Sequence, residues 1–152
     1  MPFTDGEKLR VQFRKSLRKG YVRNAQLDPE IAAAVGEVAA EGETFIVRVD
    51  RSKGGRFWFS DLRVLFEDED VRELFRYEDV RGVHWMFKDL WNRIKAEPQS
   101  GSDLKRQYFD RLEIQLADQL CVLDGLGQAY SPLFHFFGWI LKSNATSARP
   151  AR

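Results

Sequence analysis

Hydrophobic residues recur at helical spacing near the start of the chain. Leu9, Phe13 and Leu17 stand four residues apart, and Lys or Arg fills most of the other positions from 8 to 19. This pattern predicts an amphipathic helix, which we expect to end at Gly20. A second short helix is predicted after it, with Asp28 as its N-cap and Pro29 in the first helical position. Its apolar stripe would be Ile31, Val35 and Val38.

From residue 44 the hydrophobic period changes to two, which is typical of strands. Residues 51–55 end in Gly54-Gly55 and predict the turn of a hairpin. A predicted helix, 88–97, and a loop, 98–102, interrupt the strands, so residues 86–105 are interpreted as an insertion. The short connections elsewhere indicate an antiparallel meander. Its strands are predicted at 44–50, 56–60, 62–66, 73–76, 80–85, 112–116 and 119–123.

The last predicted element is a helix over residues 131–142. Ser131 is a suitable N-cap and Pro132 suits the first helical position. We expect its apolar stripe to share one core with the strand at 112–116, and residues 143–152 to form a flexible tail. The stripe consists of Leu133, Phe136, Phe137, Ile140 and Leu141.

Composition narrows the class of protein. The chain has 152 residues, 24 Lys and Arg, 23 Asp and Glu, and one Cys. The net charge of +1 disfavours a nucleic-acid binder, and one Cys excludes an internal disulfide framework. No secretory signal or membrane-spanning run is visible, so we expect a cytoplasmic protein.

The charge is distributed in blocks of opposite sign. Residues 1–23 hold seven Lys and Arg against two acids, and residues 24–47 hold five acids and no Lys or Arg. Blocks of this kind pair within a surface or between two copies of a chain.

Residues that could carry out catalysis are sparse. His84 and His135 are the only imidazoles, and neither stands at a metal-ligand spacing. The acidic run at 67–70 lacks the pattern of a calcium loop, and no phosphate-binding loop or nucleophile motif is present. We therefore expect no enzyme activity, no cofactor, no metal and no small-molecule substrate.

Three short motifs carry a resemblance to a known family. They are Glu41-Gly42-Glu43 before the first strand of the meander, the aromatic hairpin at 57–66 with its Ser60-Asp61 step, and residues 75–80 around Tyr77. With the closing helix, they resemble the pleckstrin-homology-like barrel of bacterial and GRAM type over residues 41–142. The resemblance implies an α+β fold: an antiparallel barrel of six or seven strands capped by the last helix. Residues 1–40 would be an N-terminal helical extension to it.

The expected function is a binding or scaffold module, with protein–protein interaction preferred. Phe134 and Trp139 lie beside the core stripe of the last helix, and Trp58 points away from Phe57 and Phe59. Large aromatics that a single barrel cannot cover indicate an interface. We expect either a partner protein or self-association, the latter most simply as a two-fold dimer. The alternative is that residues 1–40 fold over these aromatics within one chain.

Two further binding hypotheses remain open. Pleckstrin-homology domains that bind phosphoinositides use basic residues around the first hairpin, so the resemblance implies an anionic lipid site there. The candidate residues are Arg48, Arg51, Lys53 and Arg56. The basic N-terminal helix could instead lie on phosphate, on a membrane surface or on an acidic protein face.

Overall fold

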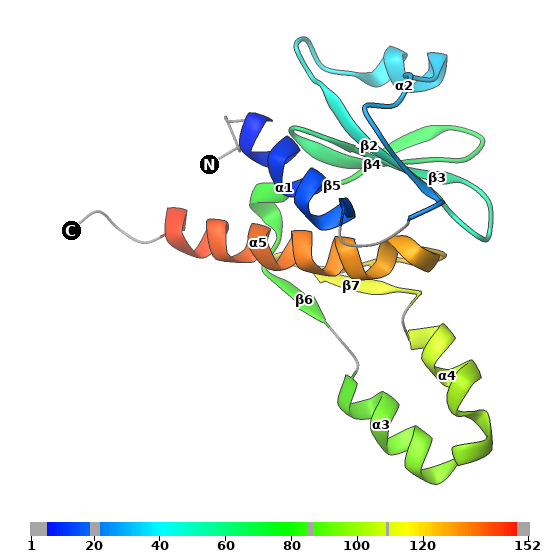
Figure 1. Cartoon of the computed structure of the whole chain (residues 1–152). Coiled ribbons are helices and arrows are strands. Elements are labelled where there is room, and N and C mark those ends of the chain that lie inside the picture. The colour runs from blue at the N-terminus through cyan, green and yellow to red at the C-terminus, as the bar shows by residue number, and fades with distance from the viewer. Residues whose placement is uncertain (1–5, 19–21, 85–86, 109, 149–152) are drawn as a thin grey trace.

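The protein is a mixed α+β structure with two antiparallel sheets. The computed structural model describes residues 6–18, 22–84, 87–108 and 110–148. The first sheet has the order β1-β2-β3-β4-β5 and the second the order β6-β7-β8. Among these residues the strands form two separate sheets and no closed barrel, and α5 runs along their junction (Figure 1).

The first sheet is a meander of adjacent strands. Its main strands are β2 (Phe45–Asp50), β3 (Arg56–Ser60), β4 (Arg63–Glu67) and β5 (Val71–Arg76). The predicted turn at 51–55 joins β2 and β3. It needs glycine at Gly55, where φ is 78° and an added Cβ would lie 2.9 Å from the Phe66 ring.

The N-terminal region was predicted as helical, and this is only partly correct. Helix α1 (Gly6–Arg18) forms and buries Leu9 and Phe13, but Ala25–Leu27 form the strand β1 beside β2. Asp28 caps no helix, because it has a φ of 48° and its N–H bonds to the carbonyl of Ile46. The second helix, α2, is shorter than predicted and spans Ala33–Val38.

The face of the sheet beneath α2 holds a small second core. Val35 of α2 packs there with Phe45, Trp58 and Leu65. Only Val35 of the predicted stripe is buried, whereas Ile31 and Val38 are exposed. The interpretation of α2 as a helix with three buried positions is therefore wrong.

The second sheet contains β6 (Gly82–His84), β7 (Leu112–Gln115) and β8 (Leu120–Leu123). Between β6 and β7 the chain forms a helical hairpin of α3 (Phe87–Ala96), the 3₁₀ turn η2 (Pro98–Ser100) and α4 (Gly101–Tyr108). This hairpin projects from the two sheets (Figure 1). The sequence predicted α3 and the insertion, but not α4.

The main core lies between the two sheets and the helices α1 and α5. As predicted, Phe136, Phe137 and Ile140 share this core with Leu112 and other inward residues of the second sheet. The ring of Phe13 stacks on that of Phe136, with centroids 3.7 Å apart. Helix α1 is thus an integral part of the core.

Helix α5 is longer than predicted at both ends. It spans Tyr130–Ala148, after the 3₁₀ turn η3 (Gly127–Ala129). Before β6 the chain forms the 3₁₀ turn η1 (Tyr77–Asp79). The side-chain amide of Asn144 on α5 donates to the carbonyls of Tyr77 and Val80, at 2.8 and 3.0 Å. These bonds hold the helix against the linker between the sheets. Residues 143–148 are therefore helical and not part of a tail, as the sequence had predicted, and 149–152 lie outside the described residues.

Candidate functional site

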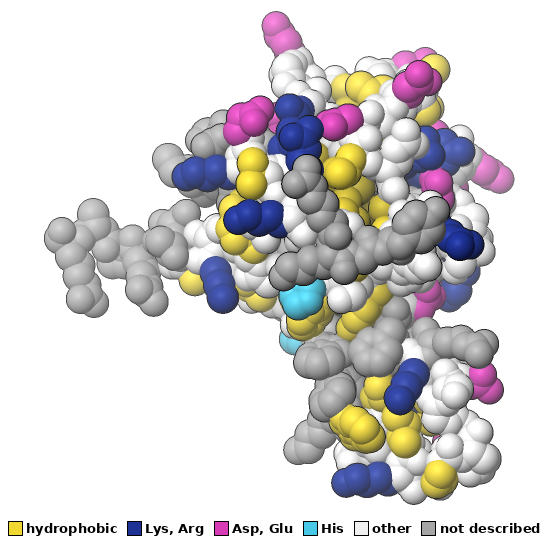
Figure 2. Space-filling view, viewed as in Figure 1, with side chains coloured by type: hydrophobic (Ala, Val, Ile, Leu, Met, Phe, Trp, Pro, Cys, Tyr) yellow, Lys and Arg dark blue, Asp and Glu magenta, His cyan; other side chains and the backbone are white. Residues whose placement is uncertain are grey.

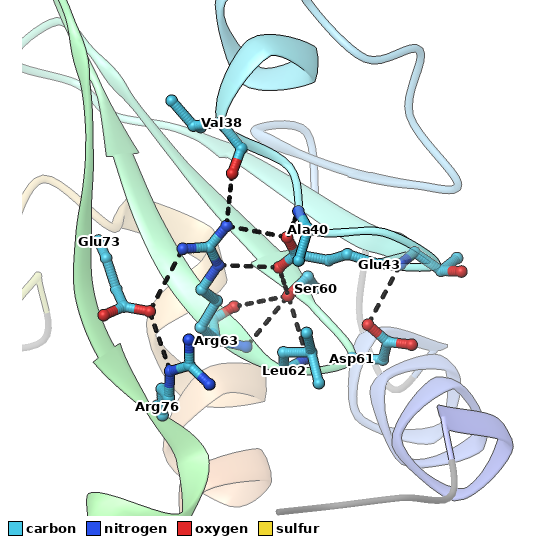
Figure 3. A network of polar contacts seen from close by, with 10 residues as sticks. Val38, Ala40, Glu43, Ser60, Asp61, Leu62, Arg63, Glu73 and Arg76 are labelled. Atoms are coloured by element: carbon cyan, nitrogen blue, oxygen red, sulfur yellow. Dashed lines mark hydrogen bonds and ion pairs between the residues drawn. The ribbon is translucent and has the colours of Figure 1, made fainter.

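A buried polar network forms where the motifs of the sequence meet (Figure 3). The Glu43 side chain is fully buried and accepts hydrogen bonds from the Ser60 hydroxyl at 2.6 Å and from Nε and Nη2 of Arg63 at 3.0 and 2.9 Å. The Ala40 N–H donates a further bond of 2.9 Å. Nη2 of Arg63 also donates to the carbonyl of Val38 at 2.8 Å, which ties the end of α2 to β4.

The electrostatics of this network favour a structural role. Burial raises the pKa of Glu43, but the hydrogen bonds from Arg63, Ser60 and Ala40 outweigh burial, so the pKa lies below 4.5. Tyr77 donates its hydroxyl proton to the carbonyl of Ser60 at 2.8 Å, and burial raises its pKa well above 10. Both groups are thus held in one protonation state at neutral pH and are bonded within the fold.

The first hairpin holds the four basic residues predicted to bind anionic lipid. Arg51 is engaged within the chain: its Nη2 lies 2.6 Å from Asp124 Oδ1, its Nε donates to the Asp124 carbonyl, and its Nη1 donates to Gly54. Lys53 is 3.4 Å from the same carboxylate, and its side chain is 60% exposed. Burial raises the pKa of Asp124, but the two cations outweigh it, so the pKa is lowered.

The other two hairpin cations share a second carboxylate. Arg48 and Arg56 approach Asp50 Oδ1 at 3.2 and 3.4 Å. The structure therefore brings all four predicted residues to one hairpin, but each lies beside an aspartate of the same chain.

The three aromatics predicted to form an interface lie in different environments. Trp58 is fully buried under α2, and its Nε1 donates to Glu67 at 2.9 Å. The expectation that its indole is exposed is wrong, because α2 covers that face of the sheet. Phe134 and Trp139 are half-buried on α5, where Trp139 lies 6.1 Å from Phe136 between ring centroids.

A groove of about 600 Å³ lies between α1 and α5, and we call it the α1–α5 groove. Figure 2 shows Lys and Arg side chains gathered over these two helices beside hydrophobic ones. The sequence predicts Phe134 and Trp139 as interface residues, and the alternative that residues 1–40 fold over these aromatics agrees with the position of α1 beside them. The sequence does not predict the part played by Gly138. The groove is lined by Gln12, Lys15, Ser16, Phe134, His135, Gly138, Trp139 and Lys142.

The groups that could bind a metal are dispersed. His84 is on β6 and His135 is on α5, and both are exposed. Burial raises the pKa of the Cys121 thiol on β8, which disfavours its reactive thiolate. Within the described ranges, no group of three or more His, Cys, Asp and Glu side chains could hold a metal ion.

Comparisons with known proteins leave the fold and the groove as the guides to function. No protein-family model, curated protein or solved structure matches this chain. Of the helices described, none has the length and apolar character needed to cross a membrane.

Proposed function

We propose that this chain is a non-enzymatic binding module that recognises another protein. The observation that carries the proposal is the α1–α5 groove, because it combines half-buried aromatics with lysines on a stable helical framework. Exposed aromatic surface framed by polar groups is typical of protein interfaces. The buried network around Glu43, in contrast, is satisfied by its own chain and serves the scaffold.

We further propose that the scaffold is pleckstrin-homology-like. Without β1, the strands divide into four in the first sheet and three in the second, and α5 follows the last strand. The three motifs that carry the resemblance also meet in one place, since Glu43, Ser60 and Tyr77 are linked by hydrogen bonds. A fold of this kind supplies a framework and does not specify a ligand.

Affinity capture tests the proposed function. The chain carries an affinity tag at its C-terminus, is expressed in its native cell and is cross-linked before capture. We expect a defined protein to be recovered at a fixed ratio to the chain and to bind again when both are purified. If no protein binds the purified chain, the proposal is wrong. Light scattering on the purified chain tests self-association, because a monomer has a mass of 17.7 kDa and a dimer would have twice this mass.

The alternative function is binding of an anionic lipid headgroup by the first hairpin. Lys53 supports it, since its side chain is largely exposed even though it lies near Asp124. The pairing of Arg51 with Asp124 reduces the charge that the hairpin can offer to a phosphate.

Co-sedimentation with vesicles containing phosphatidylinositol phosphates tests this alternative. A variant with Lys53→Glu and Arg56→Glu keeps the Arg51–Asp124 pair and reverses the two most exposed charges. Binding by the unmodified chain that this variant loses would support the lipid site, and absence of binding would remove it.

A further inference from the structure

We propose that the α1–α5 groove binds an acidic, amphipathic segment of the partner protein, with an apolar side chain seated over Gly138. This inference rests on the proposed function and names its site and the chemistry of its partner. Three features of the groove support it: a glycine at its centre, its charge, and its shape.

Gly138 is the first of these features. It lies in the interior of α5, where glycine weakens a helix relative to alanine. No tight packing with the described residues requires it, because a Cβ built at this position meets none of their atoms within 4 Å outside its own helix backbone. The space above Gly138 is therefore open, and the missing side chain leaves room for an incoming group between Phe134 and Trp139, which also line the groove.

The charge of the groove selects an acidic partner. Among the described residues, its lining contains Lys15, Lys142 and His135 and no carboxylate. Within the described part of the chain, no Asp or Glu forms an ion pair with Lys15, whereas Arg10 and Arg14 of the same helix pair with Asp28. Lys15 lines the groove and thus differs from Arg10 and Arg14, which are paired within the chain.

The shape of the groove favours a segment of chain. Its lining residues on α5 run from Phe134 to Lys142, eight residue steps, or about 12 Å along a helix. Positions 12, 15 and 16 on α1 form the opposite wall at helical spacing. A groove about two helical turns long matches the way an amphipathic helix docks through anchors at i, i+3 or i+4, and i+7.

Selection of peptides on the full chain tests this inference. A library of random 12-residue peptides is displayed and selected on the immobilised chain, and the enriched peptides are synthesised with a fluorescent label. We expect them to combine Asp or Glu with large apolar residues three or four positions apart. Fluorescence anisotropy then gives their dissociation constants for the unmodified chain and its variants.

Two groove variants and one matched control decide the result. Gly138→Leu fills the open space without a clash at its Cβ, and the pair Lys15→Glu with Lys142→Glu reverses the charge of the rim. We expect each to raise the dissociation constant at least tenfold. The control reverses Lys95 and Lys105, two exposed lysines of the helical hairpin, and should change it less than twofold. Circular dichroism and melting temperatures should show that all variants fold.

Several outcomes would overturn the inference. They are enrichment of peptides without acidic residues, equal binding by Gly138→Leu, or no enrichment at all. An unmodified chain that is dimeric and becomes monomeric on Gly138→Leu would show that a second copy fills the groove instead. If affinity capture recovers a partner that Gly138→Leu still binds, the proposed function stands and this site is wrong.

Discussion

Removing the Glu43 carboxylate should lower the free energy of unfolding by about 3–5 kcal/mol, the range found when one member of a buried ion pair is deleted. In Glu43→Ala, the largely buried Arg63 side chain loses bonds of 2.9 and 3.0 Å, and the Ala40 N–H loses its acceptor. The Ser60 hydroxyl loses its shorter bond and keeps the one of 3.2 Å to the Arg63 carbonyl. Arg63 keeps its bonds to Val38 and Glu73, so we expect the lower end of that range.

Glu73→Ala is the matched control. Glu73 also pairs with Arg63, but at 3.3 Å and with a side chain that is 39% exposed, so its loss should cost less than about 1 kcal/mol. Urea denaturation followed by tryptophan fluorescence measures both variants against the unmodified chain. Equal losses for the two, or a loss below about 1 kcal/mol for Glu43→Ala, would refute a structural role for the buried pair.

Four other results are expected. The pKa of Glu43 is lower in the folded chain than in the unfolded chain, so its contribution to stability is complete above about pH 4.5. That contribution is lost as the pH falls through the folded-state pKa. Glu43→Gln should therefore flatten the acidic part of a plot of melting temperature against pH. Phe137→Ala should cost about 3–5 kcal/mol in urea denaturation, because the ring is fully buried, and an unchanged midpoint would contradict the core assignment. Gly138→Ala should raise the free energy of unfolding by about 1 kcal/mol in urea denaturation, and an unchanged midpoint would contradict the open space above Gly138. Asn144→Ala should speed amide hydrogen exchange in the last turns of α5, and equal exchange would show that its two bonds do not hold the helix.

The sequence predicted the long periodic elements because their burial follows a regular pattern. Leu9 and Phe13 on α1 and the aromatic stripe of α5 lie in the core as expected. Short elements lack enough positions to show a period. The three residues of β1 could not be recognised, and α4 contains only one buried apolar side chain, Leu104, among its residues of described burial.

The candidate site was less predictable because it depends on contacts between distant residues. Alternation correctly placed Trp58 on the face opposite Phe59, but it could not show that α2 covers that face. Glu43 and Arg63 are 20 residues apart, and neither position alone indicates a buried pair. Likewise, the opening above Gly138 becomes visible only once α1 lies beside α5.

The way the helical hairpin joins the second sheet makes it a replaceable module. His84 of β6 is paired with Glu113 of β7, so the chain leaves the sheet and returns to it at neighbouring positions. Any insert whose two ends lie that close together satisfies the same geometry, including a tight turn of a few residues. Evolution can therefore lengthen, exchange or delete this hairpin while β6 and β7 keep their register, and related chains can differ most at this point.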